Sequence, residues 1–301
     1  MRVWLVLLVC AGCRFDHGTA EIDDSVDAND VVPIDAPPEE PFATGPFGNA
    51  ELVSISHATA RDDDIALPGD MLEIFFESDR EIAGQSDIYV ARRATLNDTW
   101  SLPAKVVELS TAMADEGSVE ISRDGLTIYF ASNRAPSTNM DVYRARRPDR
   151  GSPWGQVELV SSISDPNASD YDAQPWSDTV LYLGTARAPA LGGGDVFRST
   201  RSSAADDWGT PQLVPGLDTT KYEGEAFADR TGAIWFTNNG AGDQDIWRAE
   251  PNGDGTFKAP ELIVEICGPL IENDAWVSHD GHTIYFTSTR NGSLDVFMAK
   301  R

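Results

Sequence analysis

The stretch SRDGLTIYFASNRAPSTNMDVY, at residues 122–143, contains the pattern that decides the fold. Its Asp124-Gly125 dipeptide is followed by the apolar run Ile128-Tyr129-Phe130 and, after a polar loop, by Asp141-Val142-Tyr143. Short runs rich in β-branched and aromatic residues are typical of β-strands, and an Asp-Gly pair between such runs is typical of a hairpin turn. The stretch therefore predicts antiparallel β-structure.

The same pattern occurs five times in the chain of 301 residues. The apolar run begins at Ile74, Ile128, Leu181, Ile234 and Ile284. The triplet of aspartate, aliphatic and aromatic residues begins at Asp87, Asp141, Asp195, Asp245 and Asp295, and successive aspartates are 54, 54, 50 and 50 residues apart. A period near 50 made of short strands indicates a β-propeller with one blade per repeat.

The two ends of the repeat region predict how the ring closes. The fifth repeat stops at Arg301, after its third strand, and so lacks an outer strand. The segment 51–55 resembles the outer strands at 158–160 and 212–214 but precedes the first repeat. Pairing 51–55 with the last blade, near 295–299, would remove two exposed sheet edges. We therefore predict an all-β fold over 47–301: a five-bladed propeller of four-stranded antiparallel blades, closed by strand 51–55.

These repeats resemble a known family, the WD40-like PD40 repeat found in the propeller of the periplasmic protein TolB. The resemblance rests on Ser122-Arg123-Asp124-Gly125, the strand after it, Ser132-Asn133-Arg134 and Asp141-Val142-Tyr143. The third repeat lacks the glycine after Asp178, and Asn238-Asn239 in the fourth is not followed by arginine. TolB-type propellers usually have six blades and a separate N-terminal domain. The resemblance implies a propeller and an exported location, and no role in the Tol system.

Residues 1–13 have the layout of a secretory signal: Met1-Arg2, an apolar run from Val3 to Val9, then small residues. The run is far shorter than the roughly 20 residues that span a bilayer. Ala11-Gly12-Cys13 resembles the bacterial lipobox, which implies lipidation of Cys13, although Cys10 stands where that pattern prefers leucine. An ordinary cleaved signal is the alternative. Either way the body keeps Cys267 alone, so no disulfide within the mature chain is expected.

Residues 14–46 are acidic and proline-rich, which predicts a disordered tether. The formal net charge of the whole chain, −26, argues against nucleic acid as a partner because the field of the protein repels phosphate. We therefore expect a protein that is exported and lipid-anchored in the cell envelope. The outer membrane is favoured, because Arg14 replaces the aspartate that often retains lipoproteins at the inner membrane.

The start of the innermost strand of every predicted blade is acidic. These channel-mouth candidates are Asp62, Asp64, Glu116, Asp170, Asp172, Glu223, Glu225, Glu272 and Asp274. Equivalent positions of a closed ring converge on one axis, where carboxylates about 8 Å apart repel each other by roughly 0.5–2 kcal/mol. Such a ring requires cations, protons or basic partners. One hypothesis is therefore a site for a metal ion, a cationic group or a sugar.

Four arginines that recur with the repeat allow a structural interpretation of the same acidic residues. Arg80, Arg134, Arg187 and Arg290 each precede the next strand's aspartate by five to eight residues. We interpret them as repeated ion pairs or turn devices with Asp87, Asp141, Asp195 and Asp295. We likewise interpret the repeated aromatic residues, among them Trp176 and Trp276, as packing between blades.

An enzyme remains a less favoured interpretation. Five-bladed propeller glycosidases use channel carboxylates as acid and base or nucleophile. A catalytic pair needs two different environments and should break the repeat, whereas these acids follow it. The chain shows no nucleotide-binding loop, zinc-ligand cluster or nucleophile elbow, so we assign no catalytic residue, metal or cofactor. We predict a membrane-tethered, non-catalytic module that binds an envelope protein or peptide. The alternatives are glycan binding or hydrolysis, and cation binding by the acidic ring.

Overall fold

The computed structural model describes residues 40–240 and 242–301. The predicted signal, Cys13 and residues 14–39 of the predicted tether lie outside the described residues. Residues 42–46, which we had placed in the tether, are packed on the last blade: Ala43 N donates to Asp280 O at 2.8 Å, and the Arg301 guanidinium lies over the Phe42 ring. None of the described residues forms a helix that could cross a membrane.

The described chain forms five four-stranded antiparallel sheets, as predicted. The first blade contains β2 (Asp62–Ala66), β3 (Glu73–Ile82), β4 (Gln85–Arg92) and β5 (Ala104–Lys105). The second contains β6 (Glu116–Ile121), β7 (Thr127–Ser132), β8 (Asp141–Arg146) and β9 (Glu158–Leu159). The third contains β10 (Asp170–Pro175), β11 (Val180–Thr185), β12 (Asp195–Thr200) and β13 (Gln212–Leu213). The fourth contains β14 (Glu223–Ala228), β15 (Ile234–Asn238), β16 (Asp245–Ala249) and β17 (Glu261–Leu262).

The fifth blade confirms the predicted closure. It consists of β18 (Glu272–Val277), β19 (Thr283–Ser288), β20 (Asp295–Lys300) and, from the start of the domain, β1 (Glu51–Leu52). β1 runs antiparallel to β20, with Glu51 opposite Met298 and Leu52 opposite Phe297. Val53 N then donates to Val296 O at 2.9 Å, so the pairing is shorter than the predicted 51–55 strand but lies where it was expected.

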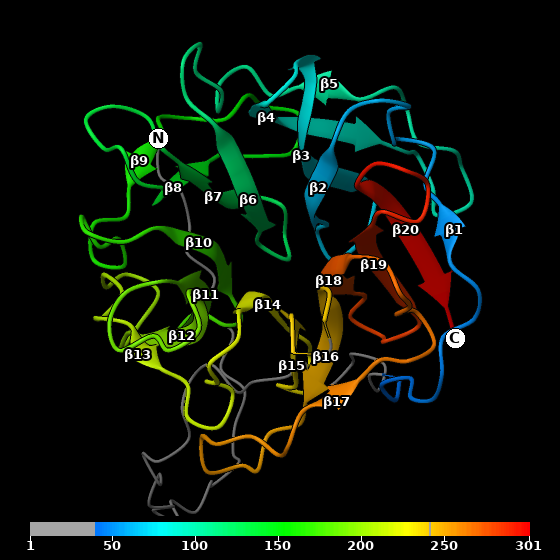
Figure 1. Cartoon of the computed structure of the whole chain (residues 1–301). Helices are drawn as coiled ribbons and strands as arrows, with labels where there is room; N and C mark the ends of the chain where they lie inside the picture. Colours follow the sequence, from blue (N-terminus) through cyan, green and yellow to red (C-terminus); the bar gives the residue numbers. More distant parts are fainter. Residues whose placement is uncertain (1–39, 241) are drawn as a thin grey trace, which may run out of the picture. The chain divides into compact units, whose positions relative to one another are not determined.

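The innermost strands surround the axis of the ring. In Figure 1, β2, β6, β10, β14 and β18 lie around the centre, and each contacts the next, ending with β18 against β2. Five clusters of buried apolar residues lie between neighbouring blades; Phe76 and Tyr89 of the first blade, for example, share a cluster with Trp276 and Tyr285 of the last. Burying one such side chain contributes about 1.5–3 kcal/mol. Packing between blades therefore holds the ring.

A β-bulge recurs in every innermost strand. The register shifts between the second and fifth residues, as between Asp63 and Ala66 in β2. The third residue has a left-handed backbone, with φ of 48–52° at Asp64, Ser118, Asp172, Glu225 and Asp274. A bulge of this kind changes the direction of a side chain, and a left-handed non-glycine residue costs roughly 1–2 kcal/mol. The bulges decide which acidic side chains reach the axis.

Candidate functional site

The nine predicted carboxylates separate into two sets with different surroundings. The first-position acids begin the innermost strands, and they are Asp62, Glu116, Asp170, Glu223 and Glu272. They are almost completely buried, at 0–1% exposure. The third-position acids sit on the bulges, and they are Asp64, Asp172, Glu225 and Asp274. The third-position acids line one cavity on the axis, and the first-position acids do not line it.

The first-position acids hold the loops that enter each blade. Each accepts a hydrogen bond from a backbone N–H four or five residues earlier, at 2.5–3.0 Å; the donors are His57, Thr111, Asp165, Thr219 and Gly268. In the second and fifth blades a serine hydroxyl of the next strand donates to the same carboxylate. Fully bonded inside the protein, these acids are structural, and our expectation that they open to the channel was wrong.

The repeated arginines pair with these acids. Arg80, Arg134, Arg187 and Arg290 lie 2.5–3.2 Å from Asp62, Glu116, Asp170 and Glu272 respectively. The alternative that these arginines form ion pairs with Asp87, Asp141, Asp195 and Asp295 was therefore wrong. Each guanidinium also donates to a loop carbonyl, such as that of Ile55 for Arg80. Arg80 lies over the Phe76 and Tyr89 rings as well, which keeps it beside the first strand.

The aspartates that we had predicted as partners of these arginines make other contacts. Asp87 pairs with Lys105 at 2.6 Å, Asp195 accepts the Leu191 N–H, and Asp295 accepts the Asn291 side-chain amide. The Oδ1 atom of Asp141 is buried without a hydrogen-bond partner. The contacts of Asp195 and Asp295 are local to the turns between second and third strands, whereas Lys105 lies on the outer strand β5.

The third-position acids meet on the axis, as the shared-axis prediction required. The cavity that they line measures about 10 Å³, roughly the space of one water molecule. The third-position acids also connect blades: Asp64 accepts the Ser118 N–H at 2.8 Å and Asp172 accepts the Glu225 N–H at 3.1 Å. In the second blade Ser118 occupies the equivalent position, so the axial ring holds four acids rather than five.

Three further acids join this axial cluster, and we had not predicted them. Asp63 and Glu77 lie beside Asp64, and Glu120 lines the cavity. The Asp62-Asp63-Asp64 run was the available sequence signal, because three acids in a buried strand cannot all face solvent. Gly117 makes room for Glu77: a Cβ atom there would lie 1.7 Å from Glu77 Oε2.

Arg61 is the cation that the described structure pairs with the axial cluster. Its guanidinium lies 3.0 Å from Asp63 Oδ2 and 2.6 Å from Glu77 Oε1. The Arg61 side chain is 46% exposed, and Arg61 directly precedes the first residue of β2. One guanidinium cannot neutralise the seven acids of the cluster, Asp63, Asp64, Glu77, Glu120, Asp172, Glu225 and Asp274.

Protonation of some of these acids neutralises part of the remaining negative charge. Burial, with the Asp64 charge nearby, raises the pKa of Asp172 to about 8. Burial also raises the pKa of Glu77, Glu225 and Asp274 well above the ordinary range. Burial opposes ionisation of Asp64 too, but hydrogen bonds from Glu77 and Asp274 and the Arg61 charge hold the pKa of Asp64 below its usual value. Glu77, Asp172, Glu225 and Asp274 therefore hold a proton more tightly than ordinary carboxylic acids, whereas Asp64 favours its ionised form.

The cluster also has features of a cation site. Oxygens of Asp63, Asp64 and Asp274 lie within 4.8 Å of one another. Glu225 Oε2 is buried without a hydrogen-bond partner. Carboxylate oxygens in this arrangement are ligands that Ca²⁺ and Mg²⁺ prefer. A second group, Asp245, Cys267 and Glu272, is less suitable, because burial raises the pKa of the Cys267 thiol to about 12 and Glu272 is already paired with Arg290.

The opposite end of the channel opens into a larger cavity of about 270 Å³, which we call the aromatic mouth. Its lining includes Trp176, Phe227, Trp276, Arg123, Arg230 and His279. Trp276 is buried between blades, as predicted, but Trp176 is 40% exposed, and its indole N–H donates to Asp229 O at 2.8 Å. Trp176 therefore contacts the fourth blade, in line with the predicted packing between blades, while part of its ring stays exposed.

Comparisons with known proteins support the fold. No family model matches the sequence, and no curated protein matches it. Among solved structures, the endo-arabinase from Bacteroides thetaiotaomicron is 11% identical over 83% of this chain and 97% of that one, with a TM-score of 0.60. Zg3597, a family 117 glycoside hydrolase from Zobellia galactanivorans, is 12% identical over 85% and 90%, with a TM-score of 0.57.

TolB is also among the structurally similar proteins. TolB from Acinetobacter baumannii is 12% identical over 80% of this chain, with a TM-score of 0.49, and the chain spans 54% of its length. At these identities the likeness to the two glycoside hydrolases shows the fold alone, and the number of blades is that of the chain's own five sheets. The activity is therefore argued from the site.

Proposed function

We propose that the protein is a non-catalytic binding module that takes a peptide segment of a partner protein at the aromatic mouth. The observation that carries this proposal is the cavity of about 270 Å³ at the centre of one propeller face. A concave, largely apolar site with a few polar groups is the usual form of a ligand site. Trp176, 40% exposed at its rim, is the kind of aromatic anchor that dominates peptide interfaces.

The charges of the mouth favour an acidic peptide. Arg123 and Arg230 line the mouth, together with one acid, Glu120, in a protein of net charge −26. A basic concavity in an acidic surface attracts an anionic group and repels cationic ones. A peptide with an aromatic residue next to a carboxylate fits both the indole and the guanidinium groups.

The axial cluster fits glycoside hydrolysis poorly. A glycosidase places two carboxyl groups about 5–9.5 Å apart on either side of a sugar bond. Here the space between the acids measures about 10 Å³, which holds a water molecule and no sugar ring. Asp64 and Asp172 accept backbone N–H groups of the next blade, so they are engaged in holding blades together.

The peptide proposal is tested by selecting a random peptide library, displayed on phage, against the immobilised full-length protein. We expect enriched acidic-aromatic peptides that bind the wild type and bind Trp176→Ala at least tenfold more weakly. Leu102→Ala is the matched control, because Leu102 is a 90% exposed apolar side chain outside the mouth. No enrichment, or equal binding to Trp176→Ala, would contradict the proposal. Release of sugar from arabinan that is lost in Asp64→Asn would support the hydrolase instead.

A second candidate function is binding of a divalent cation on the axis, favoured by the buried, unpartnered Glu225 Oε2. A cation there would replace protons, so its affinity should rise as the pH increases through about 8, where Asp172 ionises. Calorimetric titration with Ca²⁺ and Mn²⁺ at pH 7 and 9 tests this, with Asp274→Asn as the variant. Absence of heat and of thermal stabilisation at both pH values would exclude the site.

We also propose that the protein is exported and anchored in the cell envelope through a lipid on Cys13, a proposal that rests on the sequence of residues 1–13. Expression with labelled palmitate, comparing the wild type with Cys13→Ser, tests it. We expect label and membrane association in the wild type only. Label that persists in Cys13→Ser, or an unlabelled wild type, would count against the anchor.

A further inference from the structure

The fourth blade lacks the arginine that the other four blades share. In those blades the arginine follows two residues after a hydroxyl side chain of the second strand, which lies opposite the repeated aspartate of the third strand. The sequences are Ser78-Asp79-Arg80, Ser132-Asn133-Arg134, Thr185-Ala186-Arg187 and Ser288-Thr289-Arg290. The fourth blade reads Asn238-Asn239-Gly240 at this position. The other four blades thus show that this position accommodates an arginine side chain.

In those blades the guanidinium occupies a site with three parts. It pairs with the first-position acid, and it donates to the carbonyl of a loop residue: Ile55, Leu109, Ile163 or Ile266. In three blades it also lies 4.8–5.1 Å from the centres of two aromatic rings that face each other across the second and third strands. Such a cation–π contact contributes about 0.5–2 kcal/mol.

The fourth blade keeps all three parts. Phe236 and Trp247 are opposite each other on β15 and β16, as Phe76 and Tyr89 are on β3 and β4. Glu223 is the first-position acid, and Leu217 precedes Thr219 by two residues, as Ile55 precedes His57. A cavity of about 420 Å³, lined by Leu217, Phe236, Asn238, Gly240 and Trp247, lies beside the position at which the other blades carry the arginine. Glu223 does not line this cavity, and its carboxylate is held by the Asn238 amide that does.

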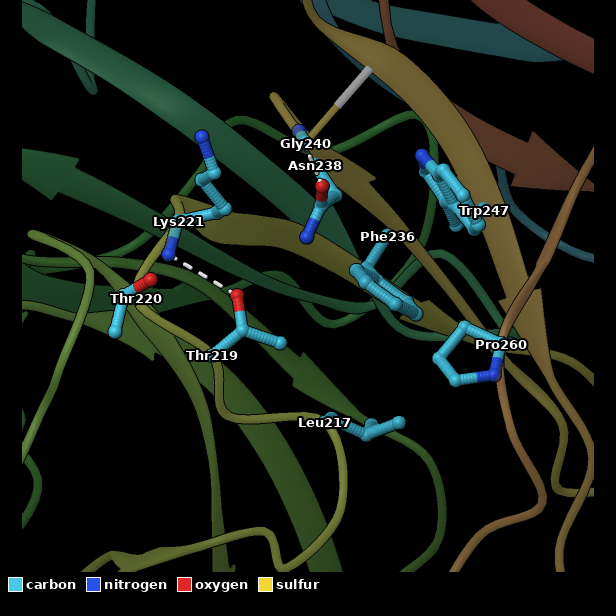
Figure 2. A pocket seen from close by; sticks show the side chains of 9 residues that line it. All are labelled: Leu217, Thr219, Thr220, Lys221, Phe236, Asn238, Gly240, Trp247 and Pro260. Atoms are coloured by element: carbon cyan, nitrogen blue, oxygen red, sulfur yellow. Dashed lines mark hydrogen bonds between the residues drawn. The ribbon is translucent and has the colours of Figure 1, made fainter.

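Glu223 already accepts hydrogen bonds from Thr219 and Asn238, whereas another polar group at the cavity lacks a partner. The Asn238 amide reaches Glu223 Oε1 at 2.5 Å and so replaces a single donor of the guanidinium. Trp247 Nε1 is buried without a hydrogen-bond partner. Figure 2 shows Phe236 and Trp247 toward one side of the cavity and Lys221 on the other, with its ammonium directed away from the rings. Lys221 is exposed and leaves the space over the rings open.

We propose that the blade-four cavity binds the guanidinium group of an arginine side chain from a partner protein, in the place that the chain's own arginine takes in the other blades. The guanidinium displaces the Asn238 amide from the Glu223 carboxylate, which then supplies the charge. Phe236 and Trp247 supply a stacking surface, and the Leu217 carbonyl accepts a hydrogen bond. A planar guanidinium stacks and donates along several directions at once, whereas an ammonium is a hydrated point charge. The site therefore selects arginine over lysine.

This site is separate from the proposed peptide site. Leu217 and Gly240 belong to the loops beside the first residue of β14, whereas the aromatic mouth lies where the innermost strands end. Failure of one proposal thus leaves the other standing. Trp176→Ala, which impairs the aromatic mouth, is expected to leave guanidinium binding unchanged.

Calorimetric titration of the full-length protein with N-acetyl-arginine amide tests the proposal, with N-acetyl-lysine amide as the matched cation. We expect the arginine compound to bind at least tenfold more tightly than the lysine compound. It should also bind more tightly than free arginine, whose α-carboxylate is repelled by the acidic surface. Any of three results would overturn the proposal. The first is no binding of the arginine compound at about 10 mM, the limit for a millimolar site. The others are equal binding of the lysine compound and tighter binding of free arginine.

The decisive variant refills the cavity from within. Gly240→Arg combined with Asn238→Ser restores the sequence of the second blade; the second change is needed because a Cβ at Gly240 would lie 2.6 Å from Asn238 Oδ1. We expect this double variant to lose binding and to unfold at a higher temperature than the wild type. Glu223→Gln should bind at least tenfold more weakly, and Lys221→Gln more tightly. Retained binding in the folded double variant would place the ligand elsewhere and refute the proposal.

Discussion

Replacing Arg134 by alanine tests whether the repeated acid–arginine pairs hold the blades. Arg134 Nη2 lies 3.2 Å from Glu116 Oε1 and 2.6 Å from the Leu109 carbonyl, and the guanidinium is 4.8 Å from the Tyr143 ring. The Glu116 side chain is fully buried, so Arg134→Ala leaves a buried carboxylate without its cation. Removing one partner of a buried pair costs about 3–5 kcal/mol.

The Arg134 side chain is 15% exposed, which places the expected loss near the lower limit, about 3 kcal/mol. For a domain of this size that loss lowers the melting temperature by roughly 6–12 °C. Urea unfolding followed by tryptophan fluorescence measures the free energy. Arg146→Ala is the matched control, because Arg146 is exposed and makes no ion pair among the described residues.

Protonation of Glu116 adds a second readout. Burial already raises the pKa of Glu116, and loss of Arg134 removes a charge that lowers it. The destabilisation should therefore be larger at pH 8 than at pH 5, where Glu116 can take up a proton. Two results would refute the reasoning. One is a loss of unfolding free energy below about 1 kcal/mol, equal to that of the control. The other is a loss that does not depend on pH.

Two further predictions concern the axial cluster. Because burial raises the pKa of Asp172 to about 8, the folded state binds this proton more tightly than the unfolded chain. The stability that this proton contributes is therefore present at pH 5 and is lost as the pH rises toward 9. The urea midpoint should fall less steeply with pH in Asp172→Asn than in the wild type. The exposed control Asp207→Asn should keep the pH dependence of the wild type. Gly117→Ala places a Cβ 1.7 Å from Glu77 Oε2 and should lower the melting temperature by several degrees, whereas Gly268→Ala, with open space at its Cβ, should not; equal melting temperatures would contradict the packing described here.

The sequence predicted the architecture because the fold is repeated. Apolar runs such as Ile128-Tyr129-Phe130 identified the strands five times over, and the unpaired Glu51-Leu52 strand required a partner, which β20 supplies. Regular patterning and edge avoidance are physical constraints that a sequence displays directly.

The direction of each acidic side chain was not predictable in the same way. Asp62 and Asp64 lie two residues apart, and strand alternation would place both on one face. The left-handed backbone of Asp64, with φ of 48°, sends its side chain to the axis while Asp62 is buried with Arg80. No residue in the sequence marks this bulge, since Asp, Ser and Glu all occupy it. The sequence shows that no arginine follows Asn239. The cavity at that position was not predictable, because it depends on how three loops pack together.

An experimental structure of the full-length protein with a library-selected peptide tests the proposed function most directly. We expect peptide density in the aromatic mouth, in contact with Trp176 and Phe227, with the axial acids closed behind it. Density at the other end of the channel, against Arg61 and Glu77, or a sugar bound between Asp64 and Glu225, would contradict the assignment of the aromatic mouth as the binding site.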